Sequence, residues 1–541
     1  MLKKMSKRSV NLLVILVYLV FFSRFFKNSF SCLDPDFGSH LRVGQDIWLK
    51  NEIPSLNTYN FDFINVPWVD HEWLFDLLIY LIYNYAGYLV LTIIFVCFPL
   101  VGIVLLMKLT EITQSIVLSD SEKVEMSLYF YFVAFLGCYA ALPCLGIRMQ
   151  EVTLIFIPLL IICLYRFENH DAQKTLYFLP ILFYVWANLH GSFLIGFVIL
   201  AIWFIVKIVI SCLPVNIGQN DYFDFGRLYD KKDYINFIGW SLLSFIITFL
   251  TPYGVKLYSF LYTYSNTYYL THVYEWLPFY YSPIFIKQIF YTLFYLITLM
   301  VYFYRVHRNS RKTAKTSLML FVLSIFFLYM SLKSKRHFIL FFMISLPLLA
   351  QWLLVILEVN KTKYQYIFSD VIVKKYLFIF LLAASAYFFI PSRITFDPFT
   401  SYCNQYPCKA VEYLKSDITC LDKNIFNMYQ WGGYLDWMWQ GKKIFIDGRF
   451  PQAIVNNHTF LEEYHEFFDK EKISKKLDQY NIDVLLLSKD FKPKLSWYEN
   501  AFANTQALEN DKFMEMYNYL KKNKKWLLKY EDDISIVYVR K

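Results

Sequence analysis

The sequence predicts a polytopic α-helical membrane protein with about 11 spanning helices, followed by a soluble α/β domain. Of its 541 residues, 57% are hydrophobic and 18% are charged, whereas soluble domains contain about 25% charged residues. Long apolar runs recur along the chain, and a helix needs about 20 residues to cross a bilayer. The clearest runs are residues 9–22, 89–107, 193–213, 283–304 and 338–357.

The N-terminal segment resembles a signal peptide, because the basic residues of MLKKMSKRSV precede the apolar run 9–22. The residues that follow, SRFFKNSF, are bulky and basic, whereas a cleavage site needs small residues. We therefore expect a retained first span with the N-terminus in the cytoplasm.

The distribution of Lys and Arg between the loops predicts the orientation of the other spans. The strongest cytoplasmic signal is RVHRNSRKTAK (305–315). The first loop, 28–73, is then extracytoplasmic, and a last span at 376–391 delivers the C-terminal part to the same side. The apolar stretch 74–107 is too long for one span, so we expect an interfacial helix at 74–85 and a span after it. The expected location is the cytoplasmic (inner) membrane of the cell envelope, and the net charge of +10 does not indicate nucleic acid because basic residues concentrate between spans.

The composition becomes more polar after Pro391, which divides the chain into a transmembrane domain (1–391) and an extracytoplasmic domain (392–541). Short apolar runs alternate there with amphipathic stretches, a pattern typical of a small α/β domain. The predicted strands are KIFIDG (443–448), DVLLLS (483–488) and ISIVYV (534–539), and the predicted helices are 457–479 and 510–523. Three cysteines, Cys403, Cys408 and Cys420, allow one disulfide and leave its pairing open.

This topology places an unusual set of polar residues at the extracytoplasmic ends of the spans. Ionisable groups near the membrane usually line a cavity or pair with each other. Carboxylates can act as bases or metal ligands, and cations can hold an anionic substrate, so the set predicts an active site on this face. Its members are Asp34, Asp36, His40, Asp70, His71, Glu72, Arg148, Glu151, Asn188, His190, Glu275, Arg336 and His337.

Two motifs in the first loop carry most of the acidic residues. In CLDPDFGSHLRVG (32–44), Asp34 and Asp36 can chelate a cation or deprotonate a hydroxyl; alternatively, they cap the helix that follows. In PWVDHEW (67–73), His71 between two acids suits metal binding or an oriented imidazole. The alternative there is helix capping by Asp70, with the tryptophans as interfacial anchors.

Basic residues in two later outer loops oppose the positive-inside trend. Arg336 in KSKRH (333–337) and Arg148 suit binding of a phosphate or pyrophosphate. The alternatives are snorkelling at a helix end and an ion pair between Arg148 and Glu151. In WANLHG (186–191), an Asn and a His either face a pocket or cap backbone groups.

The terminal domain contains a third group of polar and aromatic candidates. QWGGYLDW (430–437) is followed by FIDGR (445–449), which brings Trp431, Tyr434, Asp447 and Arg449 into the candidate pocket. The alternatives are a glycine turn and a simple ion pair between the acid and the base.

Together these motifs resemble the GT-C superfamily of membrane glycosyltransferases. DPDF is similar to the D-P-x-F motif of oligosaccharyltransferase catalytic subunits, and QWGGY with DGR loosely resembles their W-W-D-Y-G segment. Trp431 stands where that motif has its Asp, a departure that argues against recognition of a peptide sequon. Multi-span prokaryotic proteins classed as GT-C-like are more similar. The shared phrases are DPDFGSHLRVG, PWVDHEW, WANLHGSF, TPYG, EWLP and GGYL…FIDGR.

The resemblance implies an inverting transfer of a sugar from a polyprenyl-phosphate or polyprenyl-pyrophosphate carrier to an acceptor glycan, lipid or protein. Asp34, with Asp36 second, would be the base or a metal ligand, and Arg336, His337 and Arg148 would bind the lipid phosphate. A divalent cation, Mg²⁺ or Mn²⁺, is the one cofactor left open. Its candidate ligands are Asp34, Asp36, His71 and Glu72, and the other candidate pocket residues are His40, Asp70, Asn188, His190, Glu275, Trp431, Tyr434, Asp447 and Arg449.

The sequence leaves three other functions open. A polymerase or ligase of surface polysaccharide would use the same carriers on the same face. A transporter or flippase would place polar groups near the bilayer midplane and often show internal repeats. A membrane scaffold or sensor would need the terminal domain and would not need Asp34 or Arg336.

Overall fold

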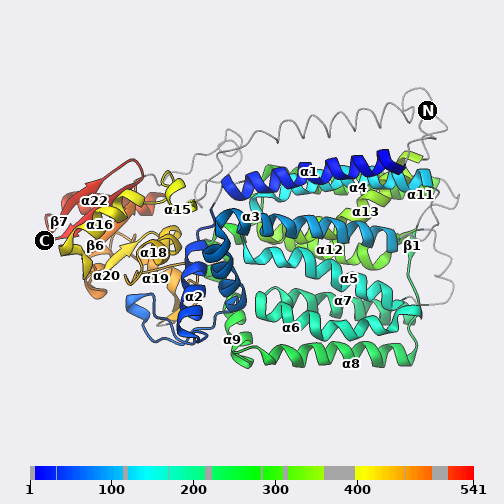
Figure 1. Ribbon diagram of the computed structural model, residues 1–541, viewed down its shortest axis with the longest axis horizontal. Coiled ribbons are helices and arrows are strands. Elements are labelled where there is room, and N and C mark those ends of the chain that lie inside the picture. The colour runs from blue at the N-terminus through cyan, green and yellow to red at the C-terminus, as the bar shows by residue number, and fades with distance from the viewer. Residues whose placement is uncertain are drawn as a thin grey trace, which may run out of the picture.

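The computed structural model shows a bundle of helices with a smaller domain at one end (Figure 1). It describes residues 7–31, 33–113, 120–168, 170–213, 222–281, 284–308, 315–358, 397–455, 457–489 and 510–541. The predicted last span, 376–391, and the predicted domain boundary after Pro391 lie outside these ranges.

The helices of the bundle run side by side along its long axis (Figure 1). Within the described ranges, seven helical segments are long and apolar enough to cross a membrane, and Leu318–Lys333 is a shorter apolar helix. The chain is therefore a multi-pass membrane protein, and the number of about 11 spans stays a prediction. The bundle consists of α1 (Lys7–Ser31), α3 (Trp73–Ile112), α4 (Asp120–Ala141), α5 (Thr153–Glu168), α6 (Leu179–Leu189), α7 (Phe193–Cys212), α8 (Lys231–Ile247), α11 (Ile286–Arg308), α12 (Leu318–Lys333) and α13 (Phe338–Glu358).

Helix α3 bends sharply at Gly87, whose φ of 80° and ψ of 173° are not helical. A residue with a side chain rarely adopts such a positive φ. The break separates a first part, which lies across the end of the bundle, from the spanning part (Figure 1). An interfacial helix next to a span is the arrangement that the apolar stretch 74–107 predicts.

The bundle and the smaller domain meet at α2 (Phe37–Lys50), which packs against both α3 and α18 (Gly432–Met438). A Cβ at Gly38 would overlap the carbonyl oxygen of Gly433, and one at Gly433 would overlap that of Pro35. The two glycine-containing motifs therefore face each other, and their backbones approach closely because neither carries a side chain.

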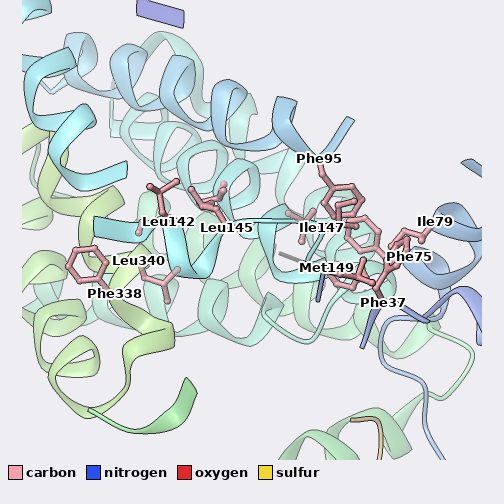
Figure 2. Close-up of a cluster of buried hydrophobic side chains, with 14 of the residues drawn as sticks. Phe37, Phe75, Ile79, Phe95, Leu142, Leu145, Ile147, Met149, Phe338 and Leu340 are labelled. Atoms are coloured by element: carbon pink, nitrogen blue, oxygen red, sulfur yellow. The ribbon is translucent and has the colours of Figure 1, made fainter. Parts of the chain in front are cut away.

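An apolar cluster supports this junction from the bundle side. Phe37, Phe75, Ile79 and Phe95 are buried, and Figure 2 shows them beside Ile147 and Met149. Truncating a buried Phe to Ala costs about 3–5 kcal/mol, so this cluster fixes the start of α2 relative to the spans.

The terminal domain contains a four-stranded sheet with the order β3-β6-β8-β7. Its strands are β3 (Ile425–Asn427), β6 (Val484–Ser488), β7 (Trp526–Glu531) and β8 (Ser535–Arg540). Strand β6 is parallel to β3 and antiparallel to β8, which is antiparallel to β7. The strands expected at 483–488 and 534–539 are present.

The prediction of a strand at 443–448 is wrong, because the structure has no strand over these residues. Only Ile444 makes isolated bridges, to Asn60 and Ile425. The backbone beyond it is held by the side chain of Asn427, whose Oδ1 accepts from Phe445 N at 3.0 Å and whose Nδ2 donates to Ile446 O at 2.8 Å. A side chain replaces the ladder partner there, which sequence periodicity does not reveal.

The prediction of one helix over 457–479 is also wrong, because this range contains two short helices, Phe460–Glu466 and Ile473–Gln479. Thr459 caps the first by accepting from Glu462 N at 3.1 Å, and the Asp469 side chain accepts from Glu471 N at 3.1 Å in the turn between them. The remaining elements are α9 (Val255–Thr263), α10 (Thr267–His272), α15 (Pro398–Ser401), α16 (Cys408–Ser416), α17 (Ile418–Leu421), α19 (Phe460–Glu466), α20 (Ile473–Gln479), α22 (Asn510–Lys522), β1 (Phe223–Asp224), β2 (Thr316–Ser317), β4 (Ile454–Val455) and β5 (His458–Thr459).

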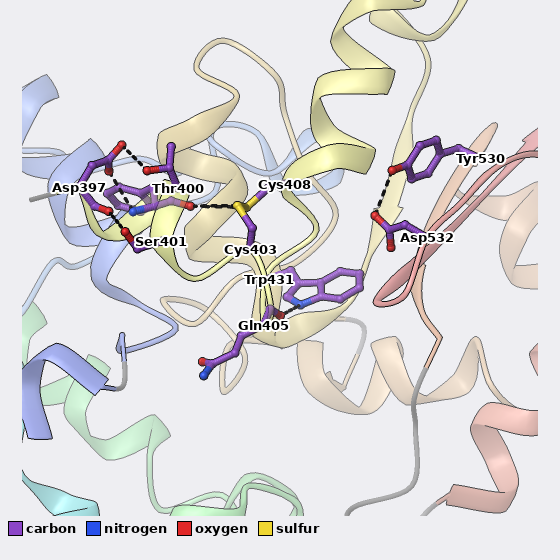
Figure 3. Close-up of a disulfide and its surroundings, with 10 residues drawn as sticks. Asp397, Thr400, Ser401, Cys403, Gln405, Cys408, Trp431, Tyr530 and Asp532 are labelled. Atoms are coloured by element: carbon purple, nitrogen blue, oxygen red, sulfur yellow. Dashed lines mark hydrogen bonds between the residues drawn. A yellow bond between two sulfur atoms is a disulfide. The ribbon is translucent and has the colours of Figure 1, made fainter. Parts of the chain in front are cut away.

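A disulfide joins Cys403 to Cys408 (Figure 3), and Cys420 is a free buried thiol. The tyrosines in and beside this loop reach the end of α1 and the residues that follow it. The hydroxyl of Tyr402 donates to Phe30 O, and that of Tyr406 donates to Leu33 O at 3.3 Å. The disulfide loop therefore ties the terminal domain to the residues just before Asp34.

Candidate functional site

A cavity of about 1150 Å³ lies between the end of the bundle and the terminal domain. Most of the polar residues singled out in the sequence line it, although they come from segments far apart in the chain. The lining residues among the candidates are Asp34, Asp36, His40, Asp70, His71, Glu72, Arg148, Glu151, His190, Glu275, Arg336, His337 and Arg449.

Four candidates do not line the cavity, and each has a structural contact instead. Asn188 accepts from Trp73 Nε1 at 3.2 Å, and Trp431 Nε1 donates to Gln405 O at 3.2 Å (Figure 3). Tyr434 stacks on Tyr406 with ring centroids 5.1 Å apart. Asp447 is fully buried and accepts from Asn60 Nδ2 at 2.9 Å. These residues hold the walls of the cavity together.

Arg148 joins two carboxylates on one wall. Its Nε lies 2.7 Å from Asp34 Oδ2, and its Nη1 lies 2.8 Å from Glu275 Oε1. The expected alternative pair with Glu151 is wrong, because Glu151 Oε1 accepts from Gly146 N at 2.6 Å. Burial would lower the pKa of Arg148, but Asp34 and Glu275 raise it above its ordinary value, so the guanidinium stays charged.

Asp36 differs from its neighbour because its side chain makes no hydrogen bond or ion pair with the residues that the structure describes. It precedes the first residue of α2 but forms no capping bond, so capping does not explain it. Its backbone N–H donates to Asp34 Oδ1 at 2.9 Å, and its carboxylate lies against Gly448, where a Cβ would overlap it. Burial first, and then the negative charge of Asp34, raise the pKa of Asp36 to about 7.

His40 is held on the next turn of α2. Its Nδ1 lies 2.7 Å from Asp76 Oδ1, and its Nε2 lies 3.9 Å from Glu72 Oε2. Burial alone would lower the pKa of His40, but Asp76 and Glu72 raise it to about 10. The imidazole is therefore a cation at neutral pH and donates to Asp76.

Glu72 faces two more histidines. His190 Nδ1 accepts from Ser192 N at 2.9 Å, which leaves the proton on Nε2, 3.0 Å from Glu72 Oε1. Burial would raise the pKa of Glu72, but His71 and His190 lower it. Burial lowers the pKa of His71 to about 4. Asp70 accepts a hydrogen bond from Glu72 N at 3.1 Å. This contact resembles helix capping, which was one of the two interpretations of Asp70 in the sequence.

Arg336 projects from the short turn between α12 and α13. Its Nε donates to Gln150 Oε1 at 2.6 Å, and its guanidinium carbon lies 5.2 Å from the centre of the Trp276 ring. Its Nη1 is 3.7 Å from Glu275 Oε2, at the long limit of an ion pair. The His337 ring packs edge-on to Trp276 at 5.6 Å. Much of the hydrogen-bonding capacity of Arg336 is thus still available.

Arg449 supports the wall that the terminal domain provides. Its Nη2 lies 2.7 Å from Asp447 Oδ2 and 2.9 Å from Asp436 Oδ2, so the expected acid–base pair forms. The guanidinium lies 3.9 Å from the Tyr59 ring centre. Its Nη1 is buried without a hydrogen-bond partner among the described residues.

The four candidate metal ligands do not form a ligand set. In the described part of the chain, no three His, Cys, Asp or Glu side chains are placed to hold a metal ion. Asp34 is bound to Arg148 and Glu72 to His190, and the His71 ring packs 5.4 Å from Phe260. Divalent cations need several oxygen or nitrogen ligands at about 2.0–2.6 Å, and the residues present do not fit that need.

Sequence reasoning missed an aromatic wall of the cavity. Several of its residues come from segment 264–276, which belongs to a predicted outer loop. The high density of aromatic residues in this segment is a signal that the sequence contains. The others come from the terminal domain. The wall contains Tyr264, Tyr269, His272, Tyr274, Trp276, Tyr429, Tyr464, His465 and Phe513.

Comparison with known proteins identifies the architecture. No family model matches the sequence, and the comparison with curated proteins gives no match. Solved structures do match. The oligosaccharyltransferase AglB from Archaeoglobus fulgidus, in complex with an inhibitory peptide and a dolichol-phosphate, aligns with a TM-score of 0.56 at 10% identity, over 98% of this chain and 74% of that one.

The chain has the fold of an archaeal oligosaccharyltransferase. A second structure from Archaeoglobus fulgidus, tethered to an acceptor peptide containing the NVT sequon, aligns with a TM-score of 0.53 at 10% identity, over 99% of this chain and 74% of that one. The GT-C-like fold expected from the motifs is thereby confirmed, including the C-terminal domain. At this identity the likeness shows the fold alone.

Proposed function

We propose that this chain is an inverting GT-C-type glycosyltransferase that moves a sugar from a polyprenyl-phosphate or polyprenyl-pyrophosphate carrier to an acceptor. The main support is one cavity that holds an unpaired carboxylate, Asp36, and an incompletely paired cation, Arg336. The dolichol-phosphate and the acceptor peptide bound by structures of the same fold support a lipid-linked donor and a separate acceptor.

Asp36 is the better candidate for the general base. A base works best when its pKa lies near the working pH, and the pKa of Asp36 is raised to about 7. Asp34 uses one carboxylate oxygen for Arg148 and the other for Asp36 N. This reverses the order that the family resemblance implies. Asp36 would take the acceptor proton while the acceptor atom bonds to the sugar and the bond to the carrier phosphate breaks.

Arg336 is the better candidate for stabilising the departing phosphate. Negative charge develops on that group as its bond to the sugar breaks, and a preplaced cation lowers the barrier. Arg148 is less suited, because Asp34 and Glu275 already neutralise it. Apolar residues line the cavity on the bundle side and suit the isoprenoid tail: Leu194, Ile195, Leu261, Ile339 and Leu340.

The position of the cavity favours an enzyme over a transporter. It lies at the end of the bundle, under the terminal domain, whereas transporters bind their substrates near the bilayer midplane. A polysaccharide polymerase or ligase fits the same cavity and differs from the proposed function only in its acceptor.

An assay on purified protein in nanodiscs, with a panel of polyprenyl-linked sugars, tests the proposal. Asp36→Asn is expected to reduce turnover by about 10²–10⁴-fold, and Arg336→Ala by about a hundredfold. Glu52→Gln, an exposed carboxylate of the same loop, is the control and keeps the wild-type rate. Equal turnover in all four proteins contradicts the roles assigned to Asp36 and Arg336. Absence of turnover in wild type on every carrier contradicts the proposed reaction and favours a scaffold or sensor.

The proposed reaction also needs the cavity on the extracytoplasmic side. The disulfide Cys403–Cys408 supports this, because such bonds persist in oxidising compartments. In intact cells, a membrane-impermeant thiol reagent is expected to label Ile418→Cys, which is 81% exposed, and to miss Ser310→Cys in the predicted cytoplasmic loop. Labelling of Ser310→Cys alone would reverse the orientation.

A further inference from the structure

The ion pairs around Arg148 come from three separate segments. Asp34 follows α1, Arg148 precedes the short helix Met149–Val152, and Glu275 lies in the short helix Tyr274–Trp276. The three side chains are 15%, 19% and 41% exposed. A cation held between carboxylates of different segments is the arrangement in which a divalent metal ion would stand.

Removal of the guanidinium would leave Asp34 and Glu275 as neighbouring carboxylates, with only Arg336 at 3.7 Å from Glu275. Carboxylates in such a site repel each other, and a cation between them relieves the repulsion. The Arg148 side chain supplies that cation permanently, because it cannot lose its proton in a protein. It donates from Nε and Nη1 to one oxygen of each acid, so the site is shaped for a planar group.

The contact continues from Arg148 to the catalytic candidate. Asp34 Oδ2 meets Arg148 Nε, and Asp34 Oδ1 accepts the backbone N–H of Asp36. Arg148 therefore orients Asp34, and Asp34 orients the backbone that carries Asp36. Arg336 reaches the same Glu275 only at 3.7 Å and does not contact Asp34.

We propose that Arg148 is the resident cation of this cavity, in the place that a divalent metal ion would take between Asp34 and Glu275. The protein then works without a metal ion, and Arg148 is a positioning residue for Asp34 and Asp36. It does not bind the carrier phosphate. This role concerns cation binding and stands independently of the proposed reaction; only the turnover and pH readouts below rest on that reaction.

Direct binding of Mn²⁺ to the purified full-length protein, followed by electron paramagnetic resonance, gives the first test. Wild type and Asp34→Asn are expected to bind the same small, non-saturating amount at millimolar Mn²⁺. Saturable binding to wild type that Asp34→Asn abolishes would overturn the proposal. A turnover rate that falls on chelation and returns with Mn²⁺ would also overturn it.

Chemical rescue gives the second test. Arg148→Ala is expected to lower the thermal midpoint, and millimolar guanidinium ion is expected to restore it. The double variant Arg148→Ala with Asp34→Asn lacks the acidic partner and is expected to show no rescue. Absence of rescue by guanidinium, or equal rescue of the double variant, would overturn the proposal.

Arg148→Lys keeps the charge and serves if Arg148→Ala does not fold. A lysine offers one ammonium point in place of two fixed N–H directions, so we expect a stable protein, still without saturable Mn²⁺ binding, whose rate falls by at least tenfold. A wild-type rate in Arg148→Lys would show that positioning is not needed and would overturn that part of the proposal.

The pH profile separates positioning from a purely structural role. Without Arg148 the charge of Asp34 loses its cation, and Glu275 keeps only the 3.7 Å contact with Arg336. Both acids already raise the pKa of Asp36. The acid limb of turnover is therefore expected to move to higher pH in Arg148→Ala. An unmoved limb would overturn the positioning role. Rescue of the thermal midpoint with no turnover on any carrier would refute the proposed function and leave the cation assignment intact.

Discussion

Two charged clusters lie at opposite ends of the bundle, and one of them lines the cavity described above. At the end near β1 (Figure 1), Lys207 Nζ lies 2.5 Å from Glu168 Oε1 and donates to Phe225 O and Arg227 O at 3.1 Å. Arg227 makes two bonds to Asp233, at 2.5 and 3.0 Å. At the cavity end, Asp36 lines the cavity, and Arg449 Nη1 is buried without a hydrogen-bond partner among the described residues. A cluster of buried charges is therefore not in itself evidence of a functional site. We base the proposed site on incompletely paired groups beside open space.

The largest expected contrast is in turnover. Asp36→Asn removes the proposed base and is expected to lower the rate of sugar transfer by about 10²–10⁴-fold without loss of folded protein. Rates measured at equal amounts of folded enzyme check this. If Asp36→Asn lowers the stability of the protein as strongly as it lowers the rate, Asp36 has a structural role and the contrast between the two clusters is wrong.

The opposite cluster is expected to control stability. Lys207→Met leaves Glu168 buried and unpaired, since these side chains are 2% and 9% exposed, and breaking such a pair costs about 3–5 kcal/mol. Thermal unfolding in detergent measures the loss. A full rate per folded molecule is expected, so reduced turnover in the surviving protein would show that the two ends are coupled.

A glycine substitution tests the close approach at the cavity wall. Gly448→Ala places a Cβ on the carboxylate of Asp36, and overpacking of this kind costs about 1–3 kcal/mol. We expect a loss of turnover larger than the loss of stability. Gly239→Ala, an exposed helical position with nothing within 4 Å of the added Cβ, is the control and gains about 0.5–1 kcal/mol.

The smallest expected effect is a shift with pH. Asp36 must lose its proton to act as a base, so turnover is expected to rise as pH passes through about 7. The folded protein binds this proton more tightly than an unfolded chain, in which the pKa is near 3.8. The contribution of Asp36 to stability is thus full below pH 3.8, falls as pH rises and is lost above 7. If the pH profile of turnover is unchanged in Asp36→Asn, the rise near pH 7 comes from another titrating group.

Hydropathy, loop charge and short motifs were enough to predict the membrane-spanning bundle, the C-terminal α/β domain and the segments that meet at the cavity. Those signals are local, because each depends on the composition of one stretch of chain. The break in the apolar stretch near Gly87 and the strands at 483–488 and 534–539 are predicted by signals of the same kind. Which compartment the cavity faces stays a prediction from loop charge.

Only the tertiary structure decided which partners each charge has. Arg148 could pair with Glu151, three residues away, yet it binds Asp34 and Glu275, more than 100 residues away on either side. Asp447 was a candidate pocket residue, but it is buried and accepts a hydrogen bond from Asn60. The backbone of segment 443–448 is held by the side chain of Asn427. Ion pairs and hydrogen bonds depend on distances of a few tenths of an ångström between segments. Packing between segments fixes those distances, so the composition of one segment does not predict them.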